Sequence, residues 1–458
     1  MRSLQVLRIG VIGCWLNLFL GTTSAQQATP IDGGQVNSPI VVINNGPGNQ
    51  ADPHVSGNLA TYTDGGTTIR YFGFLTNSTS AVPSGASGDQ DTLSDVNGGR
   101  ISFSRTKADL STAVFVYNSA SSTLTEIDPQ LGSLRFNPII GSNTMAYVDL
   151  NVGNGDIYVY DLATNPPVPP QDLSTSNNPE DGPGVSPDGN TVVWEMCVGA
   201  NCDILKAVRT GGAWTVSSVV ATPSNEENPD TDGTWIVYDS NRTGNSQIYF
   251  QPVGGGAETH LVTAGDAINP SISKGVITFE ARTGGPGDIF AYVIATNTLY
   301  QVTSTPNIDD TLNDVSVLSN GDVRVVWSSL EGGNNVYATT FTPAGVRYDI
   351  CPLYDSSLAK KSGSAYPIKI QLCDSNGDNM SSPSIVVHAV SVTRTSTNAP
   401  MVLDDTGNAN PDFDFRYDAA LNGYILNLST KGYSTGTYNL NFTAGADTAT
   451  HSAAFAVK

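Results

Sequence analysis

Carboxyl groups are the residues of this sequence whose number and spacing point to chemistry. Aspartate plus glutamate total 42 against 21 lysines and arginines, a net charge of −21. Such a charge repels nucleic acid and anionic membrane surfaces, and favours cationic or neutral partners. The acids gather before short β-rich segments that recur along the chain, and eight of them form the candidate ligand-binding set: Asp91, Glu180, Asp181, Glu226, Glu227, Asp230, Asp309 and Asp310.

A ring of these carboxylates would focus negative potential and hold a cation or a basic peptide. We therefore expect no cofactor, with calcium as the alternative occupant. Solvated turn residues are the other interpretation of the same acids. Two carboxylates could also flank a sugar as in glycosidases, but Glu195, beside Trp194, is the one acid in an aromatic strand context, and its position indicates a strand end.

Nucleophilic and metal-dependent catalysis find little support in the sequence. The one GxSxG match, Gly432–Gly436, lies between two β-rich segments and predicts a turn. Residues 374–379 offer spaced oxygen donors, but Ile385 stands where a calcium-binding EF-hand needs glutamate, which again predicts a turn. The histidines are scattered singly and are expected to be surface or strand residues: His54, His260, His388 and His451. We therefore predict no enzymatic activity.

A repeat of about 45 residues positions the acids. Its clearest mark is an aliphatic residue in the third predicted strand of each unit, at Ile69, Val114, Ile157, Ile204, Ile248, Ile289 and Val336. Four short strands per unit and many glycines and prolines predict an all-β protein, a β-propeller of about seven blades, with six as the alternative.

Each unit opens with a polar-proline or acidic step, which we interpret as the loop that leaves one blade for the next. These steps are Asp52-Pro53, Asp91-Thr92, Asn137-Pro138, Asn178-Pro179, Asn228-Pro229, Asn269-Pro270 and Asp310-Thr311. In a propeller such loops converge on one mouth of the central channel. The last unit lacks an outer strand and a spare one, Pro39–Ile43, precedes the first unit, so their pairing is expected to close the ring.

The N-terminus and the cysteines of the chain indicate export. Two arginines, a short apolar run and Thr23-Ser24-Ala25 predict a signal peptide over residues 1–25, which leaves no transmembrane segment in the mature chain. The alternative is a lipobox at Cys14. Four cysteines follow, and their spacing predicts the disulfides Cys197–Cys202 and Cys351–Cys373, with free thiols or a zinc site as alternatives.

Two segments resemble known families. The run from Asn178 to Trp194, with Ser186-Pro187-Asp188-Gly189, resembles the repeat of TolB-like (WD-type) propellers, as does Asp239–Tyr249, and the resemblance covers about residues 36–345. It implies a binding platform, since the related peptidases carry their nucleophile in a separate domain. Residues 347–458, with Pro367-Ile368-Lys369-Ile370, resemble the PxKF-type immunoglobulin-like domain of exported bacterial proteins, which implies a spacer or stabiliser.

The sequence thus predicts a signal peptide (1–25), a propeller (26–345) and a small immunoglobulin-like sandwich (346–458). We expect a secreted, periplasmic or cell-surface monomer that binds a protein, a cationic peptide or a glycan without catalysis. A carbohydrate-active propeller enzyme that uses channel carboxylates and a purely structural surface protein are the alternatives.

Overall fold

The computed structural model describes residues 25–458 apart from 152–153, 165–167, 175, 346–347, 374–376, 378, 384, 398, 405, 407–411 and 446. The predicted signal peptide up to residue 24, with Cys14, and most of the segment 374–379 lie outside the described residues. The described chain is all-β as predicted, with one short 3-10 helix, η1 (Ile294–Thr296). None of its described helices is long and apolar enough to cross a membrane.

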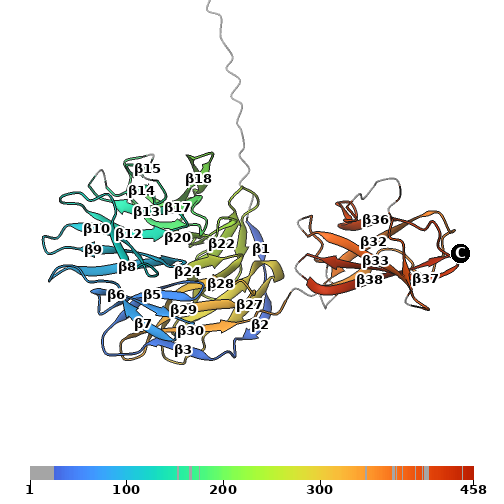
Figure 1. Cartoon of the computed structure of the whole chain (residues 1–458), viewed down its shortest axis with the longest axis horizontal. Coiled ribbons are helices and arrows are strands. Elements are labelled where there is room, and N and C mark those ends of the chain that lie inside the picture. Colours follow the sequence, from blue (N-terminus) through green and yellow to red (C-terminus); the bar gives the residue numbers. More distant parts are fainter. Residues whose placement is uncertain are drawn as a thin grey trace, which may run out of the picture.

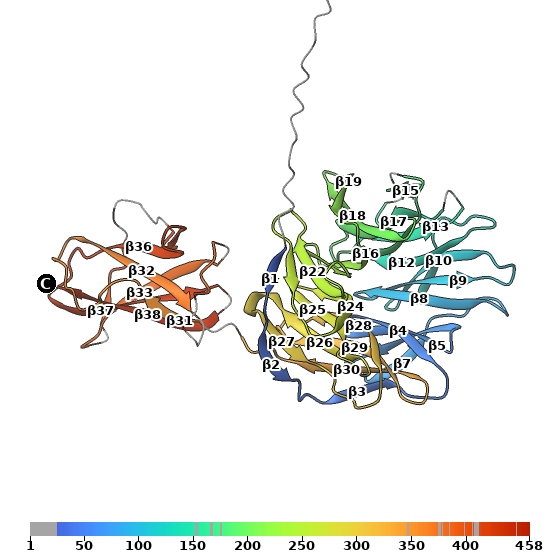
Figure 2. The same ribbon diagram turned by 180° about the vertical axis from the view of Figure 1, so that it is seen from behind.

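Seven sheets form the first part of the described chain and radiate from a common centre (Figures 1 and 2). From the centre outward their strands are β4 (Gln50–Ser56), β5 (Leu59–Asp64), β6 (Thr68–Gly73) and β7 (Ser78–Ala81); β8 (Gln90–Asn97), β9 (Arg100–Thr106), β10 (Thr112–Asn118) and β11 (Thr123–Glu126); β12 (Arg135–Ile140), β13 (Thr144–Asp149), β14 (Asp156–Asp161) and β15 (Gln171–Asp172); β16 (Glu180–Val185), β17 (Thr191–Val198), β18 (Asn201–Thr210) and β19 (Ala213–Val220); β20 (Glu226–Thr231), β21 (Trp235–Ser240), β22 (Gln247–Pro252) and β23 (Thr259–Leu261); β24 (Asp266–Ser273), β25 (Val276–Arg282), β26 (Asp288–Val293) and β27 (Thr298–Gln301); and β28 (Asp310–Val317), β29 (Val323–Leu330) and β30 (Asn334–Phe341).

The innermost strand of each sheet contacts that of the next, and β28 contacts β4, so the ring is closed. This is the arrangement of a β-propeller. The closing strand is β3 (Ile40–Asn44), which pairs antiparallel with β30 as the sequence predicts. Two further N-terminal strands, β1 (Gln26–Ala28) and β2 (Ile31–Gln35), add parallel to β23 and β27 at the outer edges of the fifth and sixth sheets.

Packing between neighbouring sheets explains why the second strand of each unit is buried along at least half of its length. Every residue of β13 is buried, because adjacent sheets cover both of its faces. Between the third and fourth sheets, Ala146 and Val148 pack in one core with the fully buried Trp194. Burial of such a side chain contributes about 3 kcal/mol, so the repeated pentamers are the main source of stability in the ring.

The last part of the described chain forms two further sheets, coloured orange to red in Figure 1. One contains β31 (Asp349–Pro352), β32 (Ala365–Cys373), β36 (Gly423–Ser429) and β35 (Arg416–Asp418); the other contains β34 (Pro400–Met401), β33 (Val387–Arg394), β37 (Gly436–Ala444) and β38 (Asp447–Val457). Alternate residues of β32 and β37 point into one shared core, which gives a small sandwich.

Both predicted cysteine pairs are at disulfide distance. Cys197 and Cys202 face each other across the β17–β18 hairpin, with their Cα atoms 4.0 Å apart. Cys351 and Cys373 join β31 to β32, with Cα atoms 6.1 Å apart. Covalent links of this kind persist in oxidising compartments.

Candidate functional site

A channel of about 310 Å³ runs through the centre of the ring, and all seven innermost strands line it. Each of these strands contains a β-bulge, because its pairing with the second strand shifts register at one point. The bulge residue has a left-handed backbone in every sheet: Asp52, Leu93, Asn137, Gly182, Asn228, Asn269 and Leu312, with φ between 49° and 58°. A bulge re-aims the side chains that follow it.

The position of the bulge corrects one prediction. Unlike Asn178-Pro179, which lies in the loop before β16, the other four polar-proline steps are not loops between blades, since Asp52-Pro53, Asn137-Pro138, Asn228-Pro229 and Asn269-Pro270 lie inside β4, β12, β20 and β24. Proline fits there because a bulge leaves one amide outside the ladder. In the other three sheets the equivalent pairs are Leu93-Ser94, Gly182-Pro183 and Leu312-Asn313, not the acidic or Asn178-Pro179 steps.

Two residues after each bulge residue, a side chain position faces the channel. The residues there are His54, Asp95, Ile139, Gly184, Asp230, Ser271 and Asp314. Three of the seven are therefore carboxylates, and His54 is the one basic side chain among the described residues of the lining.

The three channel aspartates join neighbouring sheets. Asp95 accepts hydrogen bonds from its own neighbour, Val96 N–H, and from Ile140 N–H of the next sheet, both at 2.7 Å. Asp230 bonds Thr231 and Ile272 in the same way, at 2.7 and 2.8 Å. Each carboxylate satisfies backbone donors of two innermost strands, which fixes the width of the channel.

Asp314 makes the same link where the ring closes. Its oxygens accept from Val315 N–H and from Val55 N–H of the first sheet, both at 2.7 Å. Burial raises the pKa of Asp314 to about 7 and that of Asp230 to about 6, and it also raises the pKa of Asp95. Hydrogen bonds from backbone amides oppose these shifts.

His54 is held among three carboxylates. Its Nε2 lies 3.4 Å from Asp52, and its Nδ1 lies 3.8 Å from Asp95 and 3.7 Å from Asp314. Burial lowers the pKa of His54, but the hydrogen bond to Asp52 and the three negative charges outweigh it and raise this pKa to about 10. His54 is thus an internal cation that offsets one of the three negative charges in the half of the channel formed by the seventh, first and second sheets.

A second tier of carboxylates lies near the ends of the second strands, where Glu195 lines the channel and Asp239 and Glu280 are buried. Glu195 accepts from Asn228 N–H at 2.6 Å, Asp239 from Asn269 N–H at 3.1 Å, and Glu280 from Leu312 N–H at 2.8 Å. Each acid therefore holds the bulge residue of the following sheet.

Two more acids stand close to this tier. Asp181 and Glu227 lie near enough to Glu195 to repel its charge, and Glu227 does the same to Asp239. We call Asp181, Glu195, Glu227, Asp239 and Glu280 the acidic mouth. Burial is the main cause, and like-charge repulsion a lesser one, of the raised pKa values of Glu195 and Asp239, both about 7.

Three of the eight predicted site residues are instead neutralised by arginine. Asp91 is buried and bonds Arg105 through both oxygens, at 2.6 and 2.7 Å. Asp309 accepts from Arg282 at 2.8 Å and from Gly287 N–H at 2.7 Å. The paired arginines come from a neighbouring strand or sheet edge, which the local sequence around each acid does not reveal.

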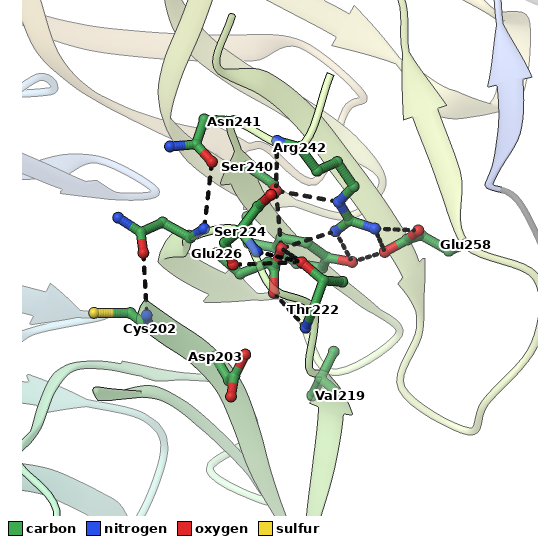
Figure 3. A network of polar contacts seen from close by, with 12 residues as sticks. Cys202, Asp203, Val219, Thr222, Ser224, Glu226, Ser240, Asn241, Arg242 and Glu258 are labelled. Atoms are coloured by element: carbon green, nitrogen blue, oxygen red, sulfur yellow. Dashed lines mark hydrogen bonds and ion pairs between the residues drawn. The ribbon is translucent and has the colours of Figure 1, made fainter. Parts of the chain in front are cut away.

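Glu226 is the third, and it sits in the polar network of Figure 3. It is fully buried, accepts from Thr222 at 2.7 Å and Ser240 at 2.9 Å, and lies 3.6 Å from Arg242. Arg242 also bonds Glu258 at 2.9 Å and packs 4.0 Å from the centre of the Tyr249 ring. Glu226 therefore stabilises the fifth sheet and does not face the channel.

Glu180 and Asp310 are also buried at the start of their strands. Burial raises the pKa of Glu180 to about 7, although Ser174 donates to it at 2.6 Å, and burial raises the pKa of Asp310 as well. Of the predicted set, Asp230 lines the channel, and Asp181 and Glu227 belong to the acidic mouth.

The predicted site set does not contain His54, Asp95, Asp314, Glu195 or Asp239. His54 was expected to be a surface or strand residue, and Glu195 a strand end, but Glu195 lies within β17 (Thr191–Val198) and lines the channel. The residue that directly follows a repeated proline was an available signal for a channel position, since His54 follows Pro53 and Asp230 follows Pro229.

The remaining chemical candidates are structural. Gly432–Gly436 forms the turn before β37, and Ser434 lies 3.4 Å from Tyr438. His260 stacks on Tyr249 at 4.7 Å, and His451 lies 2.9 Å from Asp447. Among the described residues, the one group of three close metal-type ligands is Glu195, Cys197 and Cys202, and both of its sulfurs form the disulfide.

Fold and site together define a β-propeller with a carboxylate-lined channel. No model of a known protein family matches the chain. Its fold is similar to the β-propeller domain of the trilobed protease from Pyrococcus furiosus, at 11% identity over 64% of this chain and 95% of that chain, with a TM-score of 0.49.

Two other solved structures are similar. The putative TolB from Agrobacterium tumefaciens matches at 17% identity over 60% of this chain and 98% of that chain, with a TM-score of 0.41. The acylaminoacyl peptidase from Pyrococcus horikoshii matches at 10% identity over 70% of this chain and 57% of that chain, with a TM-score of 0.48. At such identities and TM-scores the likeness says nothing of activity.

Proposed function

We propose that this chain is an exported, non-catalytic binding protein whose acidic mouth holds a positively charged segment of a protein or peptide. The observation that carries the proposal is the uneven distribution of positive charge around the channel. His54 offsets one of the three negative charges of Asp52, Asp95 and Asp314 on one side, whereas the described lining residues on the side of Glu195 and Asp230 include no cation. A lysine or arginine from a partner would supply it.

The carboxylates are suited to binding because they are fixed before a ligand arrives. Glu195, which lines the channel, accepts Asn228 N–H, so little conformational freedom is lost when a ligand binds it, and the buried Asp239 and Glu280 are fixed in the same way behind it. Asp181 is exposed and Glu227 half-buried, which leaves both able to contact a partner. The net charge of −21 would speed the approach of a basic partner.

The alternative of a glycan-cleaving enzyme has one supporting feature, the pKa values of about 7 at Glu195 and Asp239. Such values suit a general acid. However, both groups bond backbone amides, and the described residues of the channel lining include no phenylalanine, tyrosine or tryptophan on which a sugar could stack. The geometry therefore favours binding over glycoside hydrolysis.

Export and the role of the C-terminal residues belong to the same proposal. Two disulfides support a location outside the cytoplasm, secreted, periplasmic or on the cell surface. We propose that residues 346–458 form a separately folding immunoglobulin-like domain that spaces the propeller from a surface or a partner. The core of this sandwich contains residues of its own two sheets.

Binding of hexalysine to residues 26–458 tests the proposal. Isothermal titration at low ionic strength should detect binding, and the double variant Asp181→Asn/Glu227→Gln should weaken it about ten-fold, as expected for two lost ion pairs in a half-exposed site. The matched control, Asp188→Asn/Asp322→Asn, removes the same charge from turns at the opposite ends of the sheets. Equal weakening in both variants, or no binding by the wild type, would contradict the proposal.

A further inference from the structure

Exposed leucines gather on two sheets beside the channel. Leu93, Leu110, Leu131, Leu134 and Leu150 have exposed fractions of 38%, 78%, 101%, 40% and 43%. We call these five residues the leucine patch. All of them belong to the second and third sheets or to the loops that connect and end their strands.

Backbone contacts bring these loops together. Leu150 N–H donates to Leu134 O at 3.0 Å, so the end of β13 lies against the start of β12. Thr112 pairs with Leu134 and donates to Ser133 O at 2.7 Å, which places the β9–β10 turn with Leu110 beside the same loop. Leu131 lies in this loop three residues before Leu134. These contacts place the loops that carry Leu110, Leu131, Leu134 and Leu150 side by side.

The patch and the acidic mouth share one face of the propeller. Leu134 precedes β12 and Leu150 follows β13, while Asp181 is at the start of β16 and Glu195 is near the end of β17. Because successive strands of each sheet are antiparallel, the starts of all innermost strands and the ends of all second strands lie on the same face. Leu93 is itself the bulge residue of the innermost strand β8.

The backbone of Leu93 is strained. Its φ of 53° is a left-handed conformation that costs a bulky residue on the order of 1 kcal/mol, and asparagine occupies the equivalent position of three other sheets without this cost, whereas Leu312 of the seventh sheet shares the conformation of Leu93. In return Leu93 is exposed rather than packed in the core. Exposed apolar surface of this kind marks protein interaction sites.

The basic residues near the leucine patch do not repel a basic partner of the acidic mouth. The nearby cations are paired within the fold: Arg105 with Asp91, Lys107 with Glu126 at 2.9 Å, and Arg135 with Asp149 at 2.8 Å. The net field on this face is therefore set by the acidic mouth. An apolar patch beside a fixed negative centre complements a partner with apolar side chains beside basic ones.

We propose that the partner is a protein segment in which aliphatic side chains adjoin a run of lysine or arginine, with the aliphatic part on the leucine patch and the basic part at the acidic mouth. This inference rests on the proposed function of the mouth. It adds that apolar contacts with the leucine patch contribute to the affinity, so that charge alone does not give full affinity.

Two peptides test the inference on residues 26–458. One is hexalysine followed by Leu-Ala-Leu-Leu, and the other is hexalysine followed by Ser-Ala-Ser-Ser. The leucine peptide should bind about ten-fold more tightly, since partial burial of two or three leucine side chains gives that factor. The variant Leu110→Gln/Leu131→Gln should lose this preference and keep its affinity for the serine peptide.

The matched control is Leu75→Gln/Leu358→Gln, two leucines that are 82% and 66% exposed and lie away from the patch. It should keep the full preference. Equal affinities of the wild type for both peptides, or a preference that survives Leu110→Gln/Leu131→Gln, would overturn the inference and leave the proposed function standing. No binding of either peptide would overturn both.

Self-association is the other possible use of the patch. Light scattering after size-exclusion chromatography should give a monomer for the wild type. A wild-type dimer that Leu110→Gln/Leu131→Gln converts to a monomer would identify the patch as a contact between two copies, and would overturn the inference.

Discussion

The channel aspartates act as structural acceptors and as charges at once. Asp95, Asp230 and Asp314 each accept two backbone N–H groups from two sheets, so they cannot be removed without leaving buried donors. The same hydrogen bonds keep the carboxylates in place although burial raises their pKa values. Aspartate therefore both joins the innermost strands and gives the channel its negative charge.

Replacement of Asp314 by alanine should lower the free energy of unfolding by about 2 to 4 kcal/mol, because Val55 and Val315 lose their acceptor where the ring closes. Urea unfolding followed by tryptophan fluorescence measures this, since the four tryptophans after residue 25 all lie in the propeller. Asp314→Asn, which keeps one acceptor, should lose less. Ser271→Ala, at the equivalent position of the sixth sheet, is the control, and an equal loss there would contradict the role of Asp314.

Binding of hexalysine should depend on pH through the mouth. The pKa values of Glu195 and Asp239 are about 7, so both groups gain negative charge as pH rises through neutrality while lysine stays protonated. Affinity should rise about ten-fold from about pH 5 to about pH 8 at constant ionic strength. Titration calorimetry at both pH values measures this, and Glu195→Gln should flatten the dependence whereas Asp322→Asn should not.

At the scale of elements, the bulged innermost strand is what creates the site. A regular strand would alternate its side chains without interruption, but the left-handed residue shifts the register of pairing. This shift separates Glu226, which faces the interior of its sheet, from Asp230, which faces the channel. Acids a few residues apart in one strand therefore have different roles.

The N-terminal strands differ in what they contribute. β3 supplies the outer strand of the seventh sheet, and its Ile43 is buried in one core with Val326, Val336 and Val55. β1 and β2 only add a fifth strand to sheets that already have four.

A chain that begins at residue 45 should accordingly be less stable than one that begins at residue 38, by about 3 kcal/mol or more, because it loses a strand and the burial of Ile43. The chain from residue 38 should unfold close to the full-length midpoint. Urea unfolding of the three chains makes the comparison. Equal stability of both truncated chains would show that β3 does not hold the ring closed.

At the scale of the whole molecule, acidity is built into the interior as well as the surface. Burial raises the pKa values of Glu180, Glu195, Asp239 and Glu258 to about 7. These groups bind more protons in the folded than in the unfolded chain between about pH 4 and pH 7. Their ionisation therefore lowers stability as pH rises through that window.

The melting temperature of the propeller should consequently fall by about 5 °C between about pH 5 and pH 8. Loss of the His54 proton would lower stability further as pH rises through about 10, which is the same direction. High salt screens the mutual repulsion of exposed charges but not the burial of these carboxyls. The fall should therefore persist at high salt, and a melting temperature that rises with pH would contradict this account.

The sequence by itself determined the all-β propeller, the closure by the strand at Pro39–Ile43 and both cysteine pairs. These features depend on periodic apolar residues and on spacing, which are local properties. The sequence also placed Asp181, Glu227 and Asp230 near the channel, because they stand beside a repeated proline step.

Only the tertiary structure decided which acids face the channel or its acidic mouth and which are paired within the fold. Asp91, Glu226 and Asp309 have the same local setting as the others, but each meets an arginine that is 14 to 27 residues away in the chain. The channel positions of His54, Asp95 and Asp314 follow from seven bulges that sequence pattern does not distinguish from loops. Charge pairing and bulge geometry depend on contacts between strands, and these exist only in the folded ring.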